Sequence, residues 1–358
     1  MLNIVEVLYL VGYLASLIAG AWCVSEGGDI LGEKYDATII GGFIISWLNT
    51  APETIFFITA LESNSPSFAV GAISGSVIVV CTVAVGSCVY IGAKSRETGT
   101  IHLQPGVRRQ AHILGGSLIV ITSALIFGFQ YWIGILGVTY YVGFLCWTIF
   151  HRTASTPSTA IVHKSPSVES QTSIVIEDVA KEHESDDDEE EQPTWKGVAY
   201  LLAGAILIYS CSEPFISSVV NIGKGVGLSP VTLAFFFAPI ASEAPEILES
   251  ISLSRKGKTQ SINIAFSNLV GGTLSKTTLL LGILCFYAQN RGYTWVSPTY
   301  TVSMSLVLLC ALSSAAFGFS EKHSAGRGLM LAALFFFCGI VQCLLSYHTG
   351  GEDAVTIN

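Results

Sequence analysis

Asn49-Thr50-Ala51-Pro52-Glu53 stands midway along one apolar segment of the chain, and Ala241-Ser242-Glu243-Ala244-Pro245-Glu246 stands midway along another. Each stretch places a carboxylate where lipid is expected. Because a charged side chain at bilayer depth is costly, an acidic residue there is a candidate for function. In both stretches a Glu follows Pro, which removes a backbone donor and frees carbonyl oxygens to act as ligands. The two stretches predict an ion site at the membrane midplane, built from two broken helices.

The composition around these stretches is that of a polytopic membrane protein. Hydrophobic residues make up 51% of the chain and charged residues only 12%, and the mean hydropathy is +0.60. Apolar runs of about 18 to 27 residues, the length needed to cross a bilayer, recur along the sequence. Ten spans are predicted: Val7–Val24, Ala37–Leu61, Phe68–Gly92, His112–Phe129, Tyr131–Phe150, Gly197–Ile222, Ser229–Leu253, Ile262–Ala288, Thr299–Phe319 and Gly328–Tyr347. Only Gln130 separates the fourth from the fifth, so one long kinked segment is the alternative there.

The distribution of basic residues predicts the orientation, because Lys and Arg stay on the cytoplasmic side. With the N-terminus outside or in a lumen, only Lys224 and Arg291 of the 17 Lys and Arg residues fall in outer loops, and Lys276 falls within a span. The first segment carries Glu6 and lacks a basic region before it, so we expect it to remain as a span rather than to be removed as a signal peptide. Which membrane holds the protein is left open.

A central loop, 151–196, divides the chain into two halves of five spans each. It is rich in Ser, Thr and Pro, ends in a run of acids, and with eleven acids and four bases carries −7 of the whole-chain charge of −9. This composition is typical of a disordered cytoplasmic segment. A solvated tether is one interpretation of the loop, and a Ca²⁺-sensing or phosphorylation-controlled role is the other.

The two halves, 1–150 and 197–348, match in plan, and 349–358 is a short tail. In each, a Pro-Glu pair is followed by a helix remainder, a turn and a second helix rich in small residues that closes at Gly86 or Gly282. An odd number of spans per half brings the second copy into the membrane from the opposite side. The predicted fold is therefore an all-α polytopic membrane protein of about ten transmembrane helices, arranged as two inverted five-helix repeats.

With two inverted Pro-Glu motifs, each followed by a Gly-rich helix, the chain resembles the calcium/cation antiporter superfamily and its two α-repeats. The likeness covers nearly all of the chain except the central loop, with α-repeats at about 37–92 and 229–288. What the resemblance implies is a Ca²⁺ ion held by the carboxylates of Glu53 and Glu246 together with nearby hydroxyl and carbonyl oxygens. The ion would be exchanged for Na⁺ or H⁺.

Three departures from the family pattern bear on the coupling ion. The Na⁺-coupled branch usually reads Gly-Thr-Ser-x-Pro-Glu, and here one of those hydroxyls has become a third carboxylate, Glu243. Where that branch has Asn or Asp after Gly-Ser in the second helix of each repeat, this chain has Val77 and Thr273. Val cannot bind an ion, so the pattern is more similar to the proton-coupled exchangers. Lys276, in the eighth span, is unusual for any branch.

The candidate site residues fall into two groups. Residues predicted to bind the transported metal ion are Glu53, Glu246, Asn49, Thr50, Ser242 and Glu243. Residues predicted to handle the proton or coupling ion are Glu243, Lys276, Thr273 and Asn268. Glu243 and Glu246 lie three residues apart on one helical face, so the two carboxylates should share a proton. Lys276 should pair with one of the three Glu residues and act as a tethered cation.

Each assignment has a structural alternative. Glu53 and Glu246 would then be protonated and purely structural, and the small polar residues beside them would serve helix packing. Glu243 would point toward a vestibule, and Lys276 would snorkel toward the membrane surface. Glu213 and Glu249 are either part of an access path or in contact with lipid headgroups.

The function that these observations favour is secondary active antiport of Ca²⁺ against H⁺ or another monovalent cation, by alternating access. Na⁺/Ca²⁺ exchange is the alternative within the superfamily, and a channel or a transport-inactive membrane protein is the alternative outside it. We expect no enzyme, because no nucleotide-binding loop or Gly-x-Ser-x-Gly elbow is present. No cofactor and no nucleic-acid partner are expected; the partners are the lipid bilayer and the ions. The oligomeric state is left open.

Overall fold

Helices dominate the fold because a chain in lipid must satisfy its backbone hydrogen bonds within each segment. A computed structural model describes residues 4–32, 34–46, 66–150, 193–225, 238–293 and 298–348. The elements of the first half are α1 Ile4–Gly32, α2 Ala37–Ile39, η1 Ile40–Ile45, α4 Pro66–Val79, η2 Val80–Ala84, α5 Val85–Lys94, β1 Thr100–His102, α6 Pro105–Phe127 and α7 Tyr131–Phe150. Those of the second half are α9 Thr194–Gly225, α11 Ala238–Ser242, α12 Ala244–Arg255, α13 Thr259–Ser275, η4 Lys276–Leu280, α14 Leu281–Asn290, α15 Pro298–Ala315, η5 Ala316–Phe319, β2 Lys322–Ser324 and α16 Ala325–His348.

Eight helices in this part of the chain are long and apolar enough to cross a membrane. They correspond to eight of the ten predicted spans. The other two, the second and the seventh, are the segments that carry the Pro-Glu pairs. The second is described only as α2 and η1, because 47–65 lies outside the described residues. The described part of the seventh, from Ala238 on, consists of the short helices α11 and α12.

The separation of the fourth and fifth predicted spans is confirmed, and the end of the first span needs correction. The fourth and fifth are separate helices, since α6 ends at Phe127, the following Gly128 has a φ of 71° that glycine readily adopts, and α7 begins at Tyr131. The single kinked segment is therefore wrong. The first span, predicted to end at Val24, continues to Gly32. Its extension carries Glu26 and Asp29, which both lie 3.1 Å from the ammonium of Lys256.

The repeat is visible in the local geometry of the second helix of each half. The continuous helix α4-η2-α5 corresponds to α13-η4-α14, and each contains a π-helical segment of five residues. These segments begin at Val80 and Lys276, each six residues before the closing Gly86 or Gly282. Because π-helical turns occur preferentially at functional sites, their matching positions mark the centre of each repeat.

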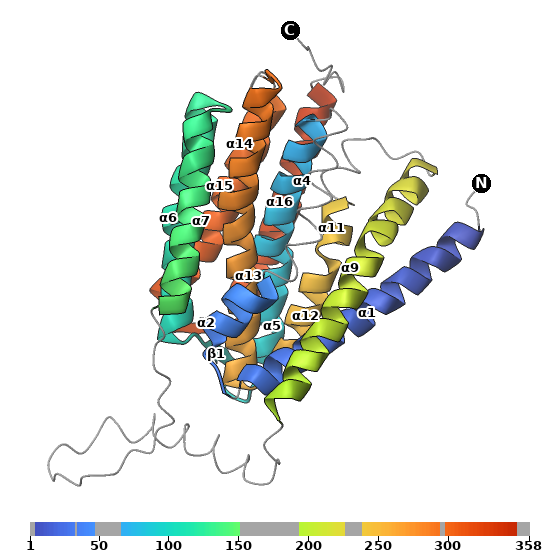
Figure 1. The fold of residues 1–358 in the computed structure, drawn as a ribbon, viewed down its shortest axis with the longest axis vertical. Coiled ribbons are helices and arrows are strands. Elements are labelled where there is room, and N and C mark those ends of the chain that lie inside the picture. Colours follow the sequence, from blue (N-terminus) through green and yellow to red (C-terminus); the bar gives the residue numbers. More distant parts are fainter. Residues whose placement is uncertain are drawn as a thin grey trace, which may run out of the picture.

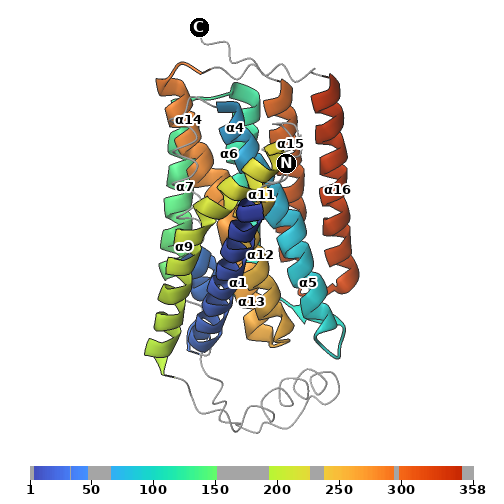
Figure 2. The same ribbon diagram turned by 90° about the vertical axis from the view of Figure 1, so that its right-hand side faces the viewer.

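The helices are arranged around α13, which lies in the interior (Figure 1). On one side, α1 and α9 run obliquely and antiparallel along each other, and α6 and α7 lie at the opposite edge of the bundle (Figure 1). Seen from the side of α1 and α9, α16 stands at the right-hand edge (Figure 2). A two-stranded antiparallel sheet, with Ile101 opposite His323, joins the α5–α6 and α15–α16 loops. This sheet was not predicted. We call the end of the bundle at which it lies the sheet end; α12 ends and α13 begins there.

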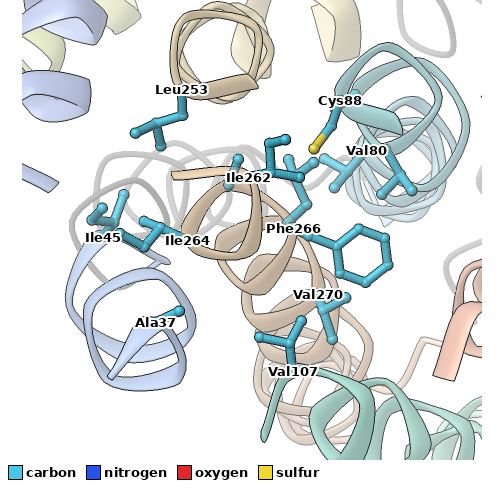
Figure 3. Close-up of a cluster of buried hydrophobic side chains, with 14 of the residues drawn as sticks. Ala37, Ile45, Val80, Cys88, Val107, Leu253, Ile262, Ile264, Phe266 and Val270 are labelled. Carbon is cyan, nitrogen blue, oxygen red and sulfur yellow. The ribbon is translucent and has the colours of Figure 1, made fainter. Parts of the chain in front are cut away.

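A hydrophobic core surrounds α13 toward the sheet end. Side chains from α12, α13, η1, η2 and α5 meet there (Figure 3). Leu253, Ile264 and Phe266 are fully buried within it. Glycines let η1 approach α13 backbone to backbone, since a Cβ at Gly41 would lie 2.2 Å from the carbonyl oxygen of Ile264. The polar site described next is therefore enclosed in apolar packing.

Candidate functional site: a buried row of carboxylates

The seventh predicted span is broken where its acidic residues lie. Glu243 stands between α11 and α12 with φ of −87° and ψ of 0°. Pro245 falls in the first turn of α12, where a missing N–H is tolerated. In a continuous helix that N–H would bond the carbonyl of Ala241, so the proline removes this bond. The predicted broken helix is thus confirmed in the second repeat.

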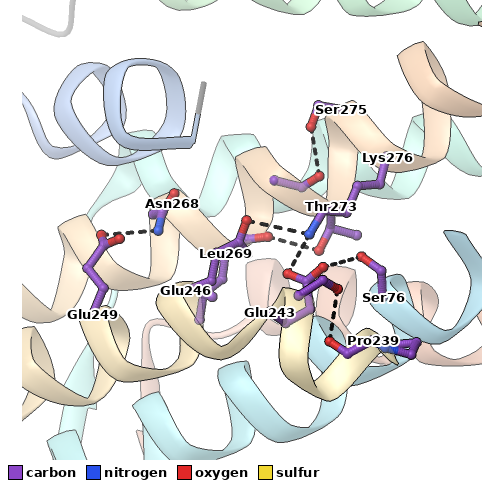
Figure 4. Close-up of polar contacts among 12 residues, drawn as sticks. Ser76, Pro239, Glu243, Glu246, Glu249, Asn268, Leu269, Thr273, Ser275 and Lys276 are labelled. Carbon is purple, nitrogen blue, oxygen red and sulfur yellow. Dashed lines mark hydrogen bonds and ion pairs between the residues drawn. The ribbon is translucent and has the colours of Figure 1, made fainter. Parts of the chain in front are cut away.

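Three carboxylates form a row on one face of α11 and α12. Glu243, Glu246 and Glu249 are spaced three residues apart and are only 1%, 3% and 0% exposed. They face α13, with Glu249 nearest the sheet end (Figure 4). Notably, Glu249 does not reach lipid headgroups, so that alternative is wrong. Buried carboxylates require partners, and α13 and η4 supply them.

Lys276 is the cationic partner of this row. It is 0% exposed, and its Nζ lies 2.6 Å from Oε2 of Glu243 and 3.4 Å from Oε1 of Glu246. Ser76 of α4 donates a hydrogen bond to the other oxygen of Glu243 (Figure 4). Both structural alternatives for this pair are wrong: Lys276 does not snorkel, and Glu243 does not point into a vestibule. The sequence prediction that Lys276 pairs with a carboxylate is confirmed.

Gly272 makes room for Glu246 on the facing helix. A Cβ at Gly272 would lie 3.3 Å and 3.4 Å from the two carboxylate oxygens of Glu246. The neighbouring Thr273 uses its hydroxyl within α13, donating to the carbonyl of Leu269 at 2.8 Å. Val77, at the corresponding place in the first repeat, is fully buried in apolar packing. Beside Glu246, α13 thus presents the bare backbone of Gly272 and, at Thr273, a hydroxyl already engaged in its own helix.

Asn268 is the partner of Glu249. Its Nδ2 donates to Oε1 of Glu249 at 3.2 Å (Figure 4). Asn268 is itself 0% exposed, and within the described part of the chain its Oδ1 has no hydrogen-bond partner. An unsatisfied buried carbonyl oxygen is uncommon and calls for an explanation.

The remaining residues predicted to bind the metal ion are Ser242, Glu53, Asn49 and Thr50. Ser242 donates its hydroxyl to the carbonyl of Pro239 at 3.1 Å, inside its own helix. Glu53, Asn49 and Thr50 lie outside the described residues, as does the side chain of Glu213. Their roles stay predictions.

Sequence reasoning missed two polar contacts near the site. Ser76 was noted only as part of a small-residue run, although its place directly before Val77 in the Gly-Ser pair could have indicated it. Gln110 of α6 is fully buried and accepts a hydrogen bond from Ser267 of α13. It packs on the bare backbone of Gly42, where a Cβ would lie 1.8 Å from its Nε2. No local motif marks Gln110, because its partners are far away in sequence.

With this geometry established, the chain can be compared with known proteins. The sequence profile of the family described as sodium/calcium exchanger protein matches residues 5–150 and 196–344, which is nearly all of the chain except the central loop. The chain belongs to this family. The resemblance to the calcium/cation antiporter superfamily is thereby confirmed, and this exchanger-family chain is a multi-pass membrane protein.

Curated relatives match over shorter stretches. The chain is 26% identical over 132 residues to the sodium/calcium exchanger NCL2 of Oryza sativa subsp. japonica, covering 35% of this chain and 23% of that protein. It is 24% identical over 131 residues to the sodium/calcium exchanger NCL of Arabidopsis thaliana, covering 36% and 22%. The matches thus span about a quarter of the length of these relatives.

Solved structures share the fold over nearly all of the chain. The sodium-calcium exchanger NCX_Mj superposes with a TM-score of 0.68 at 16% identity, covering 94% of this chain and 98% of that one. A H⁺/Ca²⁺ exchanger, CAX, superposes with a TM-score of 0.65 at 14% identity, covering 96% and 84%. The fold is therefore shared with exchangers whose names specify different coupling ions, and the coupling ion must be argued from this chain's own residues.

Proposed function

We propose that the protein is a secondary active antiporter that exchanges Ca²⁺ for protons, or for another monovalent cation, at a midplane site around Glu246. The observation that carries the proposal is the buried row of Glu243, Glu246 and Glu249 beside a helix break. Keeping several carboxylates out of water is costly unless a cation offsets their charge. Glu53, from the inverted copy of the motif, is proposed to complete the site.

The donor atoms suit a hard divalent cation. Carboxylate, amide and hydroxyl oxygens are the ligands that Ca²⁺ prefers, at six to eight positions in flexible geometry. Among the described residues, no three His, Cys, Asp or Glu side chains are arranged to hold a metal ion. The proposal therefore requires oxygens from the stretch 49–53 and from neutral groups, as the motif in the first repeat predicts.

Protons are the coupling ion that the side chains favour. Val77 offers no ligand, and the hydroxyl of Thr273 is engaged with its own helix. Glu243 adds a titratable group that contacts both Ser76 and Lys276. Na⁺ is the second candidate, favoured by the names of the curated relatives, which are sodium/calcium exchangers.

Lys276 is proposed to act as a tethered cation. Its ammonium is closer to Glu243 than to Glu246, so it stands where a transported monovalent ion would otherwise neutralise Glu243. An ion that is fixed to the protein does not cross the membrane. The exchanger would consequently move fewer coupling ions per Ca²⁺ than one without this lysine.

The site is tested by replacing Glu246 with Gln in the full-length protein reconstituted into proteoliposomes. Gln keeps the volume of the side chain but removes the charge, so uptake of ⁴⁵Ca²⁺ should be abolished while the yield of folded protein is retained. Ser250→Ala is the matched control, because Ser250 is buried on the same helix and its hydroxyl donates to the carbonyl of Ile247 at 2.9 Å, within that helix. Uptake by Glu246→Gln at the rate of the unmodified protein would refute the proposed site.

The remaining assignments extend this proposal to the whole chain. We propose that 1–150 and 197–348 are the two transmembrane repeats and that 151–196 is a cytoplasmic tether. The orientation follows from the basic residues, which gather in the loops at the sheet end, such as Arg255, Lys256 and Lys258 in the α12–α13 turn. The N-terminus then lies on the outer or lumenal side.

A further inference from the structure

We propose that Cys310 of α15 and Cys338 of α16 are a redox pair, which a hydroperoxide dissolved in the membrane converts into a disulfide that joins the two helices. The pair lies in a hydrophobic cluster to which α4, α6, α14, α15 and α16 contribute. The proposal concerns a modification of the chain, and it does not depend on which ions the chain transports.

The first observation is the contact between the two sulfurs. Sγ of Cys310 lies 3.5 Å from Sγ of Cys338, although the two residues are 28 apart in sequence. Both are free thiols and both are fully buried. Because a disulfide bond is about 2.0 Å long, the sulfurs must approach each other by about 1.5 Å to form it.

A polar contact fixes the register of the two helices beside this pair. The hydroxyl of Ser303 on α15 donates to the amide oxygen of Gln342 on α16 at 3.5 Å, and both residues are buried. Ser303 stands seven residues before Cys310, and Gln342 stands four residues after Cys338. These spacings correspond to about two helical turns and one, so the four residues lie on the faces that α15 and α16 present to each other.

Each of the two helices is also anchored to the first repeat. Ser314, one turn beyond Cys310, donates to the carbonyl oxygen of Cys81 in η2 at 3.0 Å. On α16, a Cβ at Gly328 would lie 2.5 Å from the carbonyl oxygen of Gly86, so α16 packs directly on the backbone of α5. The surrounding fold therefore positions the two thiols, and their reaction requires no rearrangement of helices.

The oxidant can approach from the lipid side of α16. This helix stands at an edge of the bundle (Figure 2). Phe336, Phe337 and Ile340, which lie close to Cys338 along the helix, are exposed. In a membrane these apolar side chains contact the acyl chains. A hydroperoxide dissolved among the acyl chains therefore reaches Cys338 past a single peripheral helix.

The chemistry is a two-electron oxidation in two steps. The sulfur of Cys338 attacks an oxygen of the hydroperoxide, the O–O bond breaks, and the products are a sulfenic acid and an alcohol. The sulfur of Cys310 then attacks the sulfenic sulfur, the S–O bond breaks, and water leaves with the proton of the second thiol. In sum, two thiols and one hydroperoxide give one disulfide, one alcohol and one water. Buried thiols react slowly, but the contact with Cys310 allows the sulfenic acid to be captured as soon as it forms.

The test exposes the full-length protein in proteoliposomes to cumene hydroperoxide, alkylates the remaining thiols and identifies disulfide-linked peptides by mass spectrometry. We expect a peptide pair joined through Cys310 and Cys338, which dithiothreitol separates again. Because the link closes a loop of the chain, the oxidised protein in detergent should have a higher Tm, and dithiothreitol should reverse the rise. Cys285→Ser is the matched control, because Cys285 is buried in the same cluster; it should keep both the link and the rise in Tm.

The variants Cys310→Ser and Cys338→Ser should each lose the link and the rise in Tm. If either variant fails to fold, the unmodified protein still decides, because the link is identified directly in its own peptides. The exposed Cys146 shows whether the oxidant has acted. Recovery of Cys310 and Cys338 as free thiols, or as separate sulfinic acids, after treatment that oxidises Cys146 would overturn the proposal. A link that joins two chains, seen as a dimer in non-reducing electrophoresis, would overturn it as well.

Discussion

At the residue scale, the most informative feature is that two departures from the family pattern contact each other. Glu243 replaces a hydroxyl residue of the motif, and Lys276 is a basic residue in the middle of a span. They are 33 residues apart in sequence, and their side chains meet at 2.6 Å in the interior. Each would be prohibitively costly alone, because an isolated buried charge has no compensating partner. Each of the two buried charges therefore requires the other as its partner.

This pairing leads to a prediction for Lys276→Met. Met fills a similar volume without the charge, so Glu243 loses its partner and must be neutralised by a mobile proton or monovalent ion. We expect the number of charges moved per Ca²⁺ to change and the pH dependence of transport to shift. The measurement is the reversal potential of ⁴⁵Ca²⁺ flux in proteoliposomes at a series of pH values.

The double variant Lys276→Met with Glu243→Gln is the control for this experiment. It removes both charges together, so the charge moved per Ca²⁺ should return toward that of the unmodified protein. If Lys276→Met alone leaves both the stoichiometry and the pH profile unchanged, the tethered-cation mechanism is wrong.

At the scale of elements, glycines set how closely α1 and α9 pack. A Cβ at Gly27 would lie 2.6 Å from the carbonyl oxygen of Gly197, and one at Gly204 would lie 2.7 Å from that of Gly20. The two contacts are seven residues apart on each helix, which is two helical turns, so they lie on one face. In lipid, small residues of this kind allow helix backbones to approach and gain van der Waals contact.

We therefore predict that Gly27→Ala destabilises the protein. The added methyl group must push the two helices apart, an overpacking cost of about 1–3 kcal/mol. Gly12, on the same helix, has nothing within 4 Å of the position of a Cβ. Gly12→Ala should be neutral or stabilising, since Ala is favoured over Gly in helices by about 1 kcal/mol. Measured in the same detergent, the Tm of Gly27→Ala should fall, and the Tm of Gly12→Ala should stay the same or rise. Equal changes in Tm for the two variants would contradict the close packing.

The small sheet contains a buried histidine, His323, whose pKa is lowered by its surroundings. His323 of β2 is 1% exposed; Arg327 donates to its Nδ1 at 2.7 Å, and its Nε2 lies 3.0 Å from the carbonyl oxygen of Ser320. Burial lowers the pKa of His323 below its ordinary value of 6.5, and the positive charge of Arg327 lowers it further. The folded protein thus binds this proton less well than the unfolded chain does.

This difference predicts a loss of stability in acid. As the pH falls below about 6.5 toward the lowered pKa, the unfolded state binds the proton first, so the free energy of unfolding decreases. His323→Gln should weaken this dependence. The check is the Tm of both proteins between about pH 5 and about pH 7.5, with the histidine ordinarily titrating inside that range. Identical pH profiles would show that His323 does not contribute.

At the scale of the whole molecule, the two halves have the same helix plan but unequal chemistry. Both repeats place a π-helical segment at the same position, beginning at Val80 in one and at Lys276 in the other. Val80 and Lys276 thus occupy equivalent places in the two repeats. Val77 and Thr273 also correspond to each other in the two repeats, and our proposal of proton coupling rests on the expectation that neither of them binds Na⁺.

The corresponding prediction concerns the driving ion. Uptake of ⁴⁵Ca²⁺ into proteoliposomes should respond more strongly to a pH gradient than to a Na⁺ gradient of the same size. The comparison is made with the membrane potential clamped, so that only the chemical gradient differs. Strong Na⁺-driven exchange without pH dependence would assign the chain to sodium coupling instead.

The sequence by itself determined the membrane class, the inverted repeat and the place of the helix break. These features can be predicted from the sequence because each depends on a local property or on a count. A bilayer requires apolar segments of a fixed length, an odd number of spans inverts the second half, and proline removes one specific backbone donor. It also named Glu243 and Glu246 as possible partners of Lys276. Which carboxylate the lysine contacts most closely depends on the angle between α12 and α13, and only the tertiary structure decided it. The same holds for Glu249 and Asn268, whose significance lies in a contact between helices, and for Gln110, whose partners come from distant parts of the chain.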